Sequence, residues 1–508
     1  MTVDRMSPLD ASFLHMEDNV SHMHIGSVAV FAGPPPPFAE VRAMLRGKLA
    51  LVPRYRQVAR FVPFDLGRPV WVDDEHFNLE YHLRHTALPS PGSEEQLRLL
   101  VSRLMGLQLD RARPLWEMWM VEGLEGDRWA IVSKVHHAIV DGVSGAELLS
   151  IIMDLSPEPS PPVPDHWVPE PGPSSLHLAT QAISDMARSP YEQLRAARAA
   201  LRVPRHALAQ LSEVLHGVRS MSNLAQQTPQ STLNGPIGPH RRYAWTEVTV
   251  AQIKHVREHV GGTFNDVVLA AITGGFRDLL LARGESVDRV VRTLVPVSVR
   301  PRDAGGVAVG DGVQENRVSA MFADLPIELT DPVERLEAVS AQMDGLKDSK
   351  QAMAGEALTS LTGFAPPLLL ALGGRIMARA PQRSLNTVTT NVPGPQLPLY
   401  CRGRLMEKAY GYVPLMGHIR VGIAIFSYNG ELTFGVTGDY DTTDDIEVLC
   451  RGIERSMQEL LDLADAAVRR EARAATPPRT RAKPKARPAT RGQSRSATSA
   501  SNKRRAAG

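Results

Sequence analysis

The stretch Val135-His136-His137-Ala138-Ile139-Val140-Asp141-Gly142 decides how this chain is interpreted. The run before the first histidine, residues 129–135, is apolar and typical of a β-strand, and Asp141-Gly142 is a turn signal. The two histidines are therefore predicted to lie at the end of a strand, just before a turn. Because adjacent strand residues point to opposite faces, only one of them is expected to face a given cleft.

A histidine in this position is suited to general-base chemistry, because its ordinary pKa of about 6.5 lets it accept a proton near neutrality. A hydroxyl nucleophile needs such a base, and Asp141 could orient the loop or an imidazole. The alternative is a purely structural pair among the sixteen histidines of the chain. We expect no metal site, since the spacing is not H-E-x-x-H and adjacent strand histidines diverge rather than chelate.

Helix and strand signals alternate on both sides of this stretch. Upstream, the patterns predict strands at 27–31 and 129–137 and helices at 40–51 and 94–105. Downstream, they predict a helix over 264–283 with Thr263 as its N-cap, strands at 290–297, 316–321 and 385–391, a hairpin of 419–427 with 432–437 around Asn429-Gly430, and a final helix with an apolar stripe from Ile446 to Leu460.

These patterns predict an α/β protein with two similar mixed-sheet domains. Eight of the eighteen residues from Ser156 to Pro173 are proline, which indicates a stiff connector, and helical spacing follows it. We therefore predict an N-terminal domain over 1–155, a Pro-rich and helical connector over 156–239, a C-terminal domain over 240–465 and a disordered basic tail over 466–508. Ligand sites in such proteins often lie between domains.

The chain of 508 residues has a formal net charge of only +2, but the charge is unevenly distributed. From Arg469 to Gly508 there are thirteen Lys or Arg and one acid, Glu471, so this stretch carries about +12 and the remainder about −10. The basic stretch has almost no large apolar residue and cannot bury enough surface to fold alone. The only cysteines, Cys401 and Cys450, are expected to be reduced thiols rather than a disulfide scaffold.

The complete pattern H-H-x-x-x-D-G resembles the motif of the CoA-dependent acyltransferase superfamily, and the rest of the chain is similar to the bacterial wax ester synthase/acyl-CoA:diacylglycerol acyltransferase family. The resemblance runs from about residue 6 to 465 in family order. It rests on the opening Met6-Ser7-Pro8-Leu9-Asp10-Ala11-Ser12-Phe13 with His24-Ile25-Gly26, on Arg113-Pro114-Leu115-Trp116-Glu117, on Phe264-Asn265-Asp266-Val267, on Pro296-Val297-Ser298-Val299-Arg300, on Asn316-Arg317-Val318-Ser319 and on Thr390-Asn391-Val392-Pro393-Gly394-Pro395.

The resemblance implies a role for each matching residue. His137 would be the base that deprotonates the acceptor hydroxyl, His136 would point away and hold the strand end, Asp141 would fix the loop, and Gly142 would permit the turn. Asn265 and Asp266 of the family's ND motif would bind substrate, although an N-terminal helix cap is the alternative for Asn265. The Pro114-Leu115-Trp116 segment is expected to pack beneath the channel.

The implied reaction moves a long-chain acyl group from acyl-CoA to diacylglycerol, with long-chain alcohol as a second acceptor. Acyl-CoA is then a substrate, and no cofactor and no acyl-enzyme are expected, since no G-x-S-x-G elbow occurs. One departure is Glu315 where the family usually has glycine, which puts substrate preference in doubt.

Two other functions remain open from the sequence alone. One is a condensation-type or polyketide-associated acyltransferase with carrier-bound donors, and the other is a non-catalytic lipid-inclusion or nucleic-acid binding protein. Without a signal peptide or an apolar run long enough to span a bilayer, we expect a cytoplasmic protein. Its basic tail could attract it to an anionic membrane or lipid inclusion, whereas nucleic acid is the less favoured partner.

Overall fold

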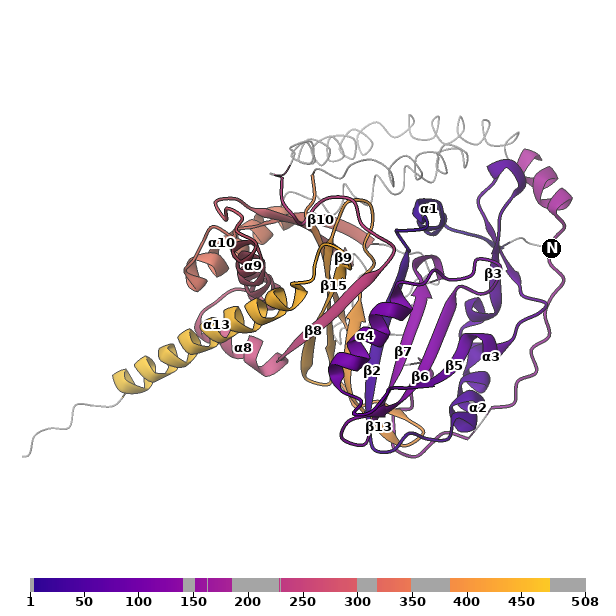
Figure 1. Ribbon diagram of the computed structural model, residues 1–508, viewed down its shortest axis with the longest axis horizontal. Helices are drawn as coiled ribbons and strands as arrows, with labels where there is room; N and C mark the ends of the chain where they lie inside the picture. Colours follow the sequence, from indigo (N-terminus) through magenta and orange to yellow (C-terminus); the bar gives the residue numbers. More distant parts are fainter. Residues whose placement is uncertain are drawn as a thin grey trace, which may run out of the picture.

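The computed structural model describes residues 4–139, 151–161, 163–184, 228, 230–298, 318–348 and 384–475. Within these residues the chain forms two mixed α/β domains that lie side by side (Figure 1), as the sequence predicts. Each domain is built on a six-stranded sheet, and a three-stranded sheet is added to the first domain.

The large sheet of the N-terminal domain has the strand order β12-β13-β2-β7-β6-β5. Its four strands from the first part of the chain are β2 (His24–Ala32), β5 (Leu83–Ala87), β6 (Trp116–Leu124) and β7 (Arg128–His136). The small sheet has the order β1-β4-β3, with β1 (Asp4–Arg5), β3 (Gln57–Arg60) and β4 (Val70–Asp73). The helices are α1 (Pro8–Met16), α2 (Phe38–Lys48), α3 (Leu79–His82) and α4 (Glu94–Met105), with short 3-10 turns η1 (Leu49–Leu51), η2 (Pro53–Arg56), η3 (Pro63–Asp65) and η4 (His137–Ile139).

The apolar run of β2 is buried on both faces of the sheet. Ala29 and Phe31 belong to the apolar cluster that contains α2, whereas Val28 and Val30 belong to the cluster that contains α4. The sequence prediction of α4 agrees with its bounds, and a capping box of Ser93 with Gln96 begins this helix.

The sheet of the C-terminal domain has the order β10-β9-β11-β14-β15-β8, with parallel pairing of β11 to both of its neighbours. Its strands are β8 (Arg241–Thr249), β9 (Val291–Ser298), β10 (Val318–Leu325), β11 (Thr387–Pro393), β14 (Val421–Tyr428) and β15 (Glu431–Asp439). Four helices cover it, namely α8 (Val250–His259), α9 (Phe264–Ala282), α10 (Pro332–Asp348) and α13 (Ile446–Ala475). Thr263 caps α9 as predicted, and the predicted hairpin turns through Asn429 and Gly430, both with positive φ.

The predicted C-terminal domain of 240–465 needs one correction. Strands β12 (Tyr400–Cys401) and β13 (Arg404–Tyr412) leave it and extend the N-terminal sheet, where β13 pairs antiparallel with β2. β13 also packs on β14 and β15, so it joins the two sheets. Gly435 permits this contact, because a Cβ atom there would lie 1.9 Å from the carbonyl oxygen of Gly411 on β13.

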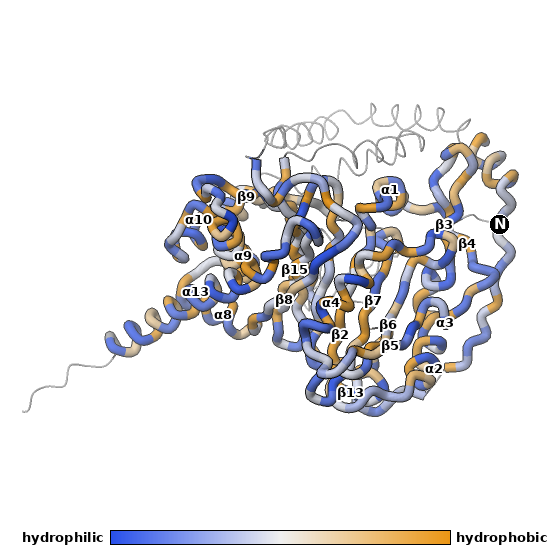
Figure 2. The backbone as a smooth tube through the Cα atoms, viewed as in Figure 1, coloured by the Kyte–Doolittle hydropathy of each residue, from blue (hydrophilic) through white to orange (hydrophobic). Residues whose placement is uncertain are grey.

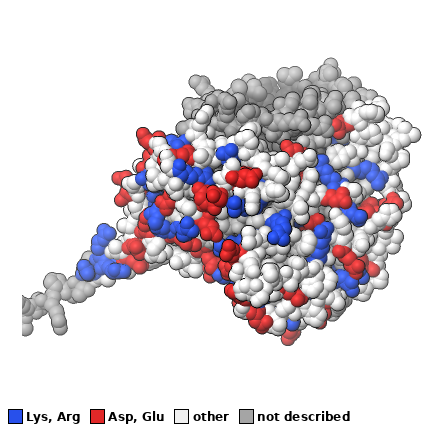
Figure 3. Space-filling view, in the orientation of Figure 1, with Lys and Arg blue, Asp and Glu red and all other residues white. Residues whose placement is uncertain are grey.

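The predicted tail of 466–508 also needs a correction, since α13 continues to Ala475 and projects from the domain (Figure 1). Basic side chains gather on this projecting end, whereas both signs of charge are mixed over the rest of the visible face (Figure 3). The predicted apolar stripe from Ile446 to Leu460 is buried against α9 and the sheet. Residues 476–508 lie outside the described part of the chain.

The Pro-rich part of the connector is bound along the N-terminal domain. Asp165 forms an ion pair of 2.6 Å with Arg56, and the ring of Trp167 lies under the same guanidinium. The backbone N–H of Glu170 donates to Asp73, and Arg60 donates to the carbonyl of Pro173. The segment is therefore a strap on the domain surface, and a helix over 175–184 follows it.

Candidate active site

His137 lies where the sequence predicts it, at the first position after β7. Its backbone N–H donates to the carbonyl of Met23 over 2.8 Å, and its ring stacks on Phe13 of α1 with 4.2 Å between centroids. The side chain is half-buried, whereas His136 and Ala138 on either side are fully buried. Burial lowers the pKa of His137 to about 4, so the imidazole is a neutral proton acceptor at physiological pH.

His136 is the last residue of β7, and its side chain is fully buried. Its backbone lies opposite His24 on β2, and its Nδ1 accepts a hydrogen bond of 3.1 Å from the backbone N–H of Ala138. With Nδ1 as acceptor, the ring carries its proton on Nε2, which lies 3.6 Å from Oε2 of Glu17. His136 thus connects the residue after His137 to a buried carboxylate.

Glu17, at the end of α1, is the centre of a buried polar network. Its Oε2 accepts two hydrogen bonds from Arg111, at 2.8 and 2.6 Å, and its Oε1 accepts one of 3.3 Å from the backbone N–H of Met23. Burial alone would raise the pKa of this carboxyl, but His136 and Arg111 outweigh burial and lower it to about 2. Glu17 is therefore ionised at every pH at which His137 is neutral.

The two oxygens of Glu17 hold the turn around His137 from two sides. Oε2 lies beside His136, whose Nδ1 accepts the N–H of Ala138. Oε1 accepts the N–H of Met23, whose carbonyl accepts the N–H of His137 itself. The sequence analysis did not identify Glu17 or Arg111. Both lie beside quoted family motifs, but they are more than ninety residues apart and come together with His136 only in the fold.

The Pro114-Leu115-Trp116 segment supports the same strand end from behind. The carbonyl of Leu115 accepts the backbone N–H of His136 over 2.9 Å. Trp116 is buried, stacks between Tyr55 and His82, and donates through Nε1 to the carbonyl of Tyr55 over 2.8 Å. These contacts are packing contacts, as the sequence predicts for this segment.

The two residues of the ND motif have different environments. Asn265, in the first turn of α9, is half-buried and its Oδ1 accepts a hydrogen bond of 2.6 Å from Asn391 on β11. Asp266 is fully buried and accepts hydrogen bonds from the N–H of Thr263 and from Ser340. The carboxylate of Asp266 completes the capping box of α9. The cap itself is Thr263, not Asn265.

His137 and the ND amide both lie at the junction of the two domains. The loop that carries Met23 also bonds to the C-terminal domain, since the carbonyl of Val20 accepts from Arg241 and Oγ of Ser21 accepts from Gly417. Val392, next to Asn391, packs against the apolar cluster that contains Ala138 and Ile139. Asp141, Gly142 and Glu315, which the sequence analysis singled out, lie outside the described residues.

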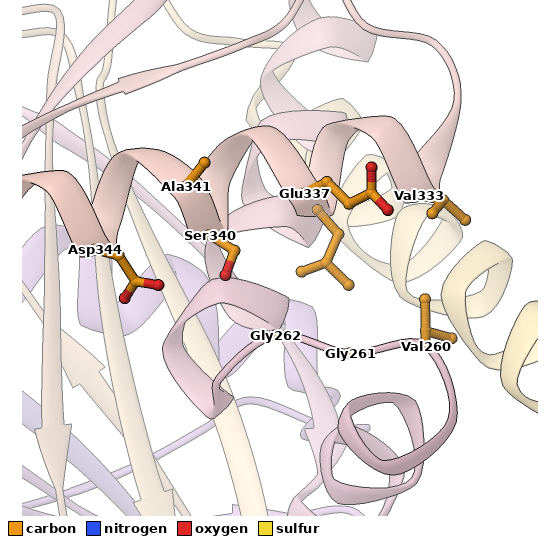
Figure 4. A pocket seen from close by; sticks show the side chains of 9 residues that line it. Val260, Gly261, Gly262, Val333, Glu337, Ser340, Ala341 and Asp344 are labelled. Carbon is orange, nitrogen blue, oxygen red and sulfur yellow. The ribbon is translucent and has the colours of Figure 1, made fainter.

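Other candidate groups do not add chemistry to this junction. Cys401 and Cys450 are buried and unpaired, as expected, and burial raises the pKa of each thiol to about 12. In the described parts of the chain, no three His, Cys, Asp or Glu side chains come together as a metal site. A cavity of about 270 Å³ lies between the α8–α9 turn and α10 (Figure 4), and its lining includes neither His137 nor Asn265.

Comparison with known proteins agrees with this geometry. Residues 6–268 match the wax ester synthase/diacylglycerol acyltransferase catalytic domain, and residues 314–461 match the C-terminal domain of the same family. The probable diacylglycerol O-acyltransferase tgs1 of Mycobacterium tuberculosis is 36% identical over 471 residues, which cover 91% of this chain and 96% of that protein. The probable diacylglycerol O-acyltransferase tgs2 of the same species is 30% identical and is covered over 99% of its length.

Solved structures show the same fold. The wax ester synthase/diacylglycerol acyltransferase of Marinobacter aquaeolei VT8 matches with a TM-score of 0.65 and 26% identity, covering 91% of this chain and all of that one. A condensation domain of the calcium-dependent antibiotic synthetase matches with a TM-score of 0.56 and 16% identity, over 91% of this chain and 96% of that one, and shares the fold alone. The chain therefore belongs to the wax ester synthase/diacylglycerol acyltransferase family.

Proposed function

We propose that this chain transfers a long-chain acyl group from acyl-CoA to the free hydroxyl of diacylglycerol, forming triacylglycerol and CoA. The observation that carries this proposal is a neutral, half-buried His137 at the domain junction, held by the network of Glu17. The family and its named relatives support the substrates. Long-chain alcohol is proposed as a second acceptor, which would give a wax ester.

In the proposed reaction, Nε2 of His137 takes the proton of the acceptor hydroxyl while the hydroxyl oxygen attacks the thioester carbonyl. The resulting tetrahedral oxyanion collapses, the carbon–sulfur bond breaks, and the CoA sulfur leaves with the proton that His137 received. No cofactor is needed for this balance. An acyl-enzyme is also unnecessary, and the high thiol pKa of both cysteines fits a direct transfer.

Asn265 is proposed to bind the substrate at this junction. Because its Oδ1 is occupied by Asn391, its Nδ2 is left as the donor end of the amide. A donor aimed at the developing oxyanion would stabilise the tetrahedral intermediate. Asp141 and Gly142 are proposed to fix the loop that follows His137.

We further propose that the protein works at the cytoplasmic face of a membrane or on lipid inclusions, where diacylglycerol resides. The net charge of about +12 between Arg469 and Gly508 supports attraction to anionic lipid, whereas nucleic acid is the less favoured partner. Among the residues that the structure describes, no helix is both long enough and apolar enough to cross a bilayer. Glu315 is proposed to affect acceptor preference rather than catalysis.

The acceptor can be identified with the purified full chain and labelled palmitoyl-CoA. We expect labelled triacylglycerol from diacylglycerol, a smaller yield of wax ester from hexadecanol, and equimolar release of free CoA. Thin-layer chromatography and a thiol reagent measure these products. Transfer only from or to a carrier protein would contradict the proposal and favour a condensation-type enzyme.

The low pKa of His137 predicts an acid limb of activity at low pH. Since the base is neutral above its pKa, kcat/KM should stay level from neutrality downward and fall as pH drops through about 4. Burial also lowers the pKa of His22, His24 and His82, so the unfolded chain binds protons below about pH 6.5 that the fold does not. Stability should therefore decrease in the same direction, and circular dichroism at each pH separates the two effects. If kcat/KM instead falls near pH 6.5 while the fold stays intact, the pKa of His137 is not lowered by burial and the prediction is contradicted.

A further inference from the structure

Phe64 is the most exposed large apolar side chain among the described residues, with 87% of its surface accessible. It lies at the tip of the hairpin between β3 and β4, in the turn η3. Phe64 and Asp65 both have left-handed backbone, with φ of 58° and 52°. This region is unfavourable for a bulky residue and natural for glycine, so neither packing nor backbone preference explains a phenylalanine here.

The hairpin beneath Phe64 is firmly packed. Val62 is buried with Val70 and Val72 and contacts the helix over 175–184 through Leu178 and Ala182. The opposite side of that helix leaves Leu176 and Ile183 exposed, at 76% and 56%. Figure 2 shows the apolar colouring of the hairpin tip and of the adjacent helix, above the labels of β3 and β4. Exposed apolar side chains on a rigid support indicate a surface for contact with a partner.

Two arginines lie at the base of the hairpin. The guanidinium of Arg5 lies against Gly67, where an added Cβ atom would be 3.1 Å from its Nη1, and Arg68 follows directly in the chain. Burial and the charge of Arg5 both lower the pKa of Arg68. No described acidic side chain forms an ion pair with Arg68, so its guanidinium can bind an anion above the hairpin. The apolar tip of the hairpin matches the acyl layer of a lipid surface, and the cationic side chain at the foot of the hairpin matches the phosphate layer.

The hairpin is separated from the active site by one helix. Phe61, directly after β3, contacts the ring of His15 on α1 with 5.9 Å between centroids. Two residues earlier on α1, Phe13 stacks on His137. A lipid surface bound at the hairpin would therefore lie beside α1, the helix that supports His137.

We infer that the surface formed by Phe61, Phe64, Leu176 and Ile183 with Arg68 docks on an anionic phospholipid bilayer, with Phe64 inserted among the acyl chains. We call it the hairpin surface. This docking goes beyond the proposed acyl transfer and beyond attraction by the basic tail, and it can be measured without turnover. The apolar tip distinguishes it from the tail, whose contribution is electrostatic alone.

The test is flotation of the full-length protein with two kinds of vesicle, pure phosphatidylcholine and equimolar phosphatidylcholine with phosphatidylglycerol. Phe64→Gly should weaken binding to both by about tenfold, the effect of withdrawing one aromatic side chain from an apolar layer. Arg68→Gln should weaken binding about fivefold on the anionic vesicles and leave binding to phosphatidylcholine unchanged. The matched control, Leu99→Ser with Arg103→Gln, changes an exposed leucine and an exposed arginine on α4 and should alter neither.

Phe64→Gly also separates docking from folding. Because glycine suits the left-handed backbone, the temperature of unfolding should not fall, although vesicle binding does. Equal vesicle binding by wild type, Phe64→Gly and Arg68→Gln would overturn the inference. It would also be overturned if the wild type, but not Phe64→Gly, formed dimers at the concentrations used, since the hairpin surface would then bind a second copy of the chain. A chain that binds vesicles as expected but shows no acyl transfer would contradict only the proposed function.

Discussion

His137→Ala is expected to reduce kcat for triacylglycerol formation by about a thousandfold, because removal of a positioned general base usually costs two to four orders of magnitude. The side chain is half-buried, and its described contact is the ring stack on Phe13. The hydrogen bond from the backbone N–H of residue 137 to Met23 is kept when alanine replaces histidine. The variant should therefore fold. Release of CoA from palmitoyl-CoA in the presence of diacylglycerol measures the loss.

His85→Ala is the matched control for this change. His85 also stacks on a phenylalanine, Phe38, with 4.8 Å between centroids, and lies in the same sheet on β5. Its removal deletes the same kind of ring contact without touching the strand end, so kcat should stay within about twofold of wild type. If His137→Ala turns over at the rate of the His85→Ala control, the assignment of His137 as the general base is refuted.

The place of the two histidines at a strand end was predictable from the apolar run before them, and His136 is the last residue of β7 while His137 is the first of η4. The network behind them was not. Glu17 and Arg111 are separated by more than ninety residues, one directly after α1 and the other in the loop before β6, and they meet only in the folded chain. No local spacing carries that information, and for the same reason the crossing of β13 into the N-terminal sheet was missed.

Two other differences do have local causes. Thr263 and Asp266 have the spacing of a capping box, a local signal that the predicted substrate contact of Asp266 left unused. The last turns of α13 were assigned to the tail because Val468 is the only large apolar residue of 466–475. Five of these ten residues are Ala and three are Arg, which are strong helix formers, and extending a helix that is already packed is far easier than nucleating one.

Glu17→Gln is expected to lower kcat by about 10- to 100-fold while KM for acyl-CoA changes by less than about threefold. Glutamine keeps the size of the side chain, but it removes the charge that Arg111 and Nε2 of His136 face. The turn that carries His137 then loses its two-sided restraint, and small displacements of a base reduce the rate more than they reduce binding. Steady-state kinetics with varied palmitoyl-CoA separate kcat from KM.

Glu117→Gln provides the control for lost stability. Glu117 is a second buried carboxylate with two cationic partners, Lys134 at 3.2 Å and Arg84 at 3.1 Å, yet its described ion pairs reach β7 at Lys134 and not at His136. Both variants should lose about 1–3 kcal/mol of unfolding free energy, since each leaves buried polar groups poorly paired. Only Glu17→Gln should lose kcat, and Glu17→Asp, which restores the charge, should recover part of it. If both glutamine variants lose kcat in proportion to stability, Glu17 stabilises the fold and does not position His137.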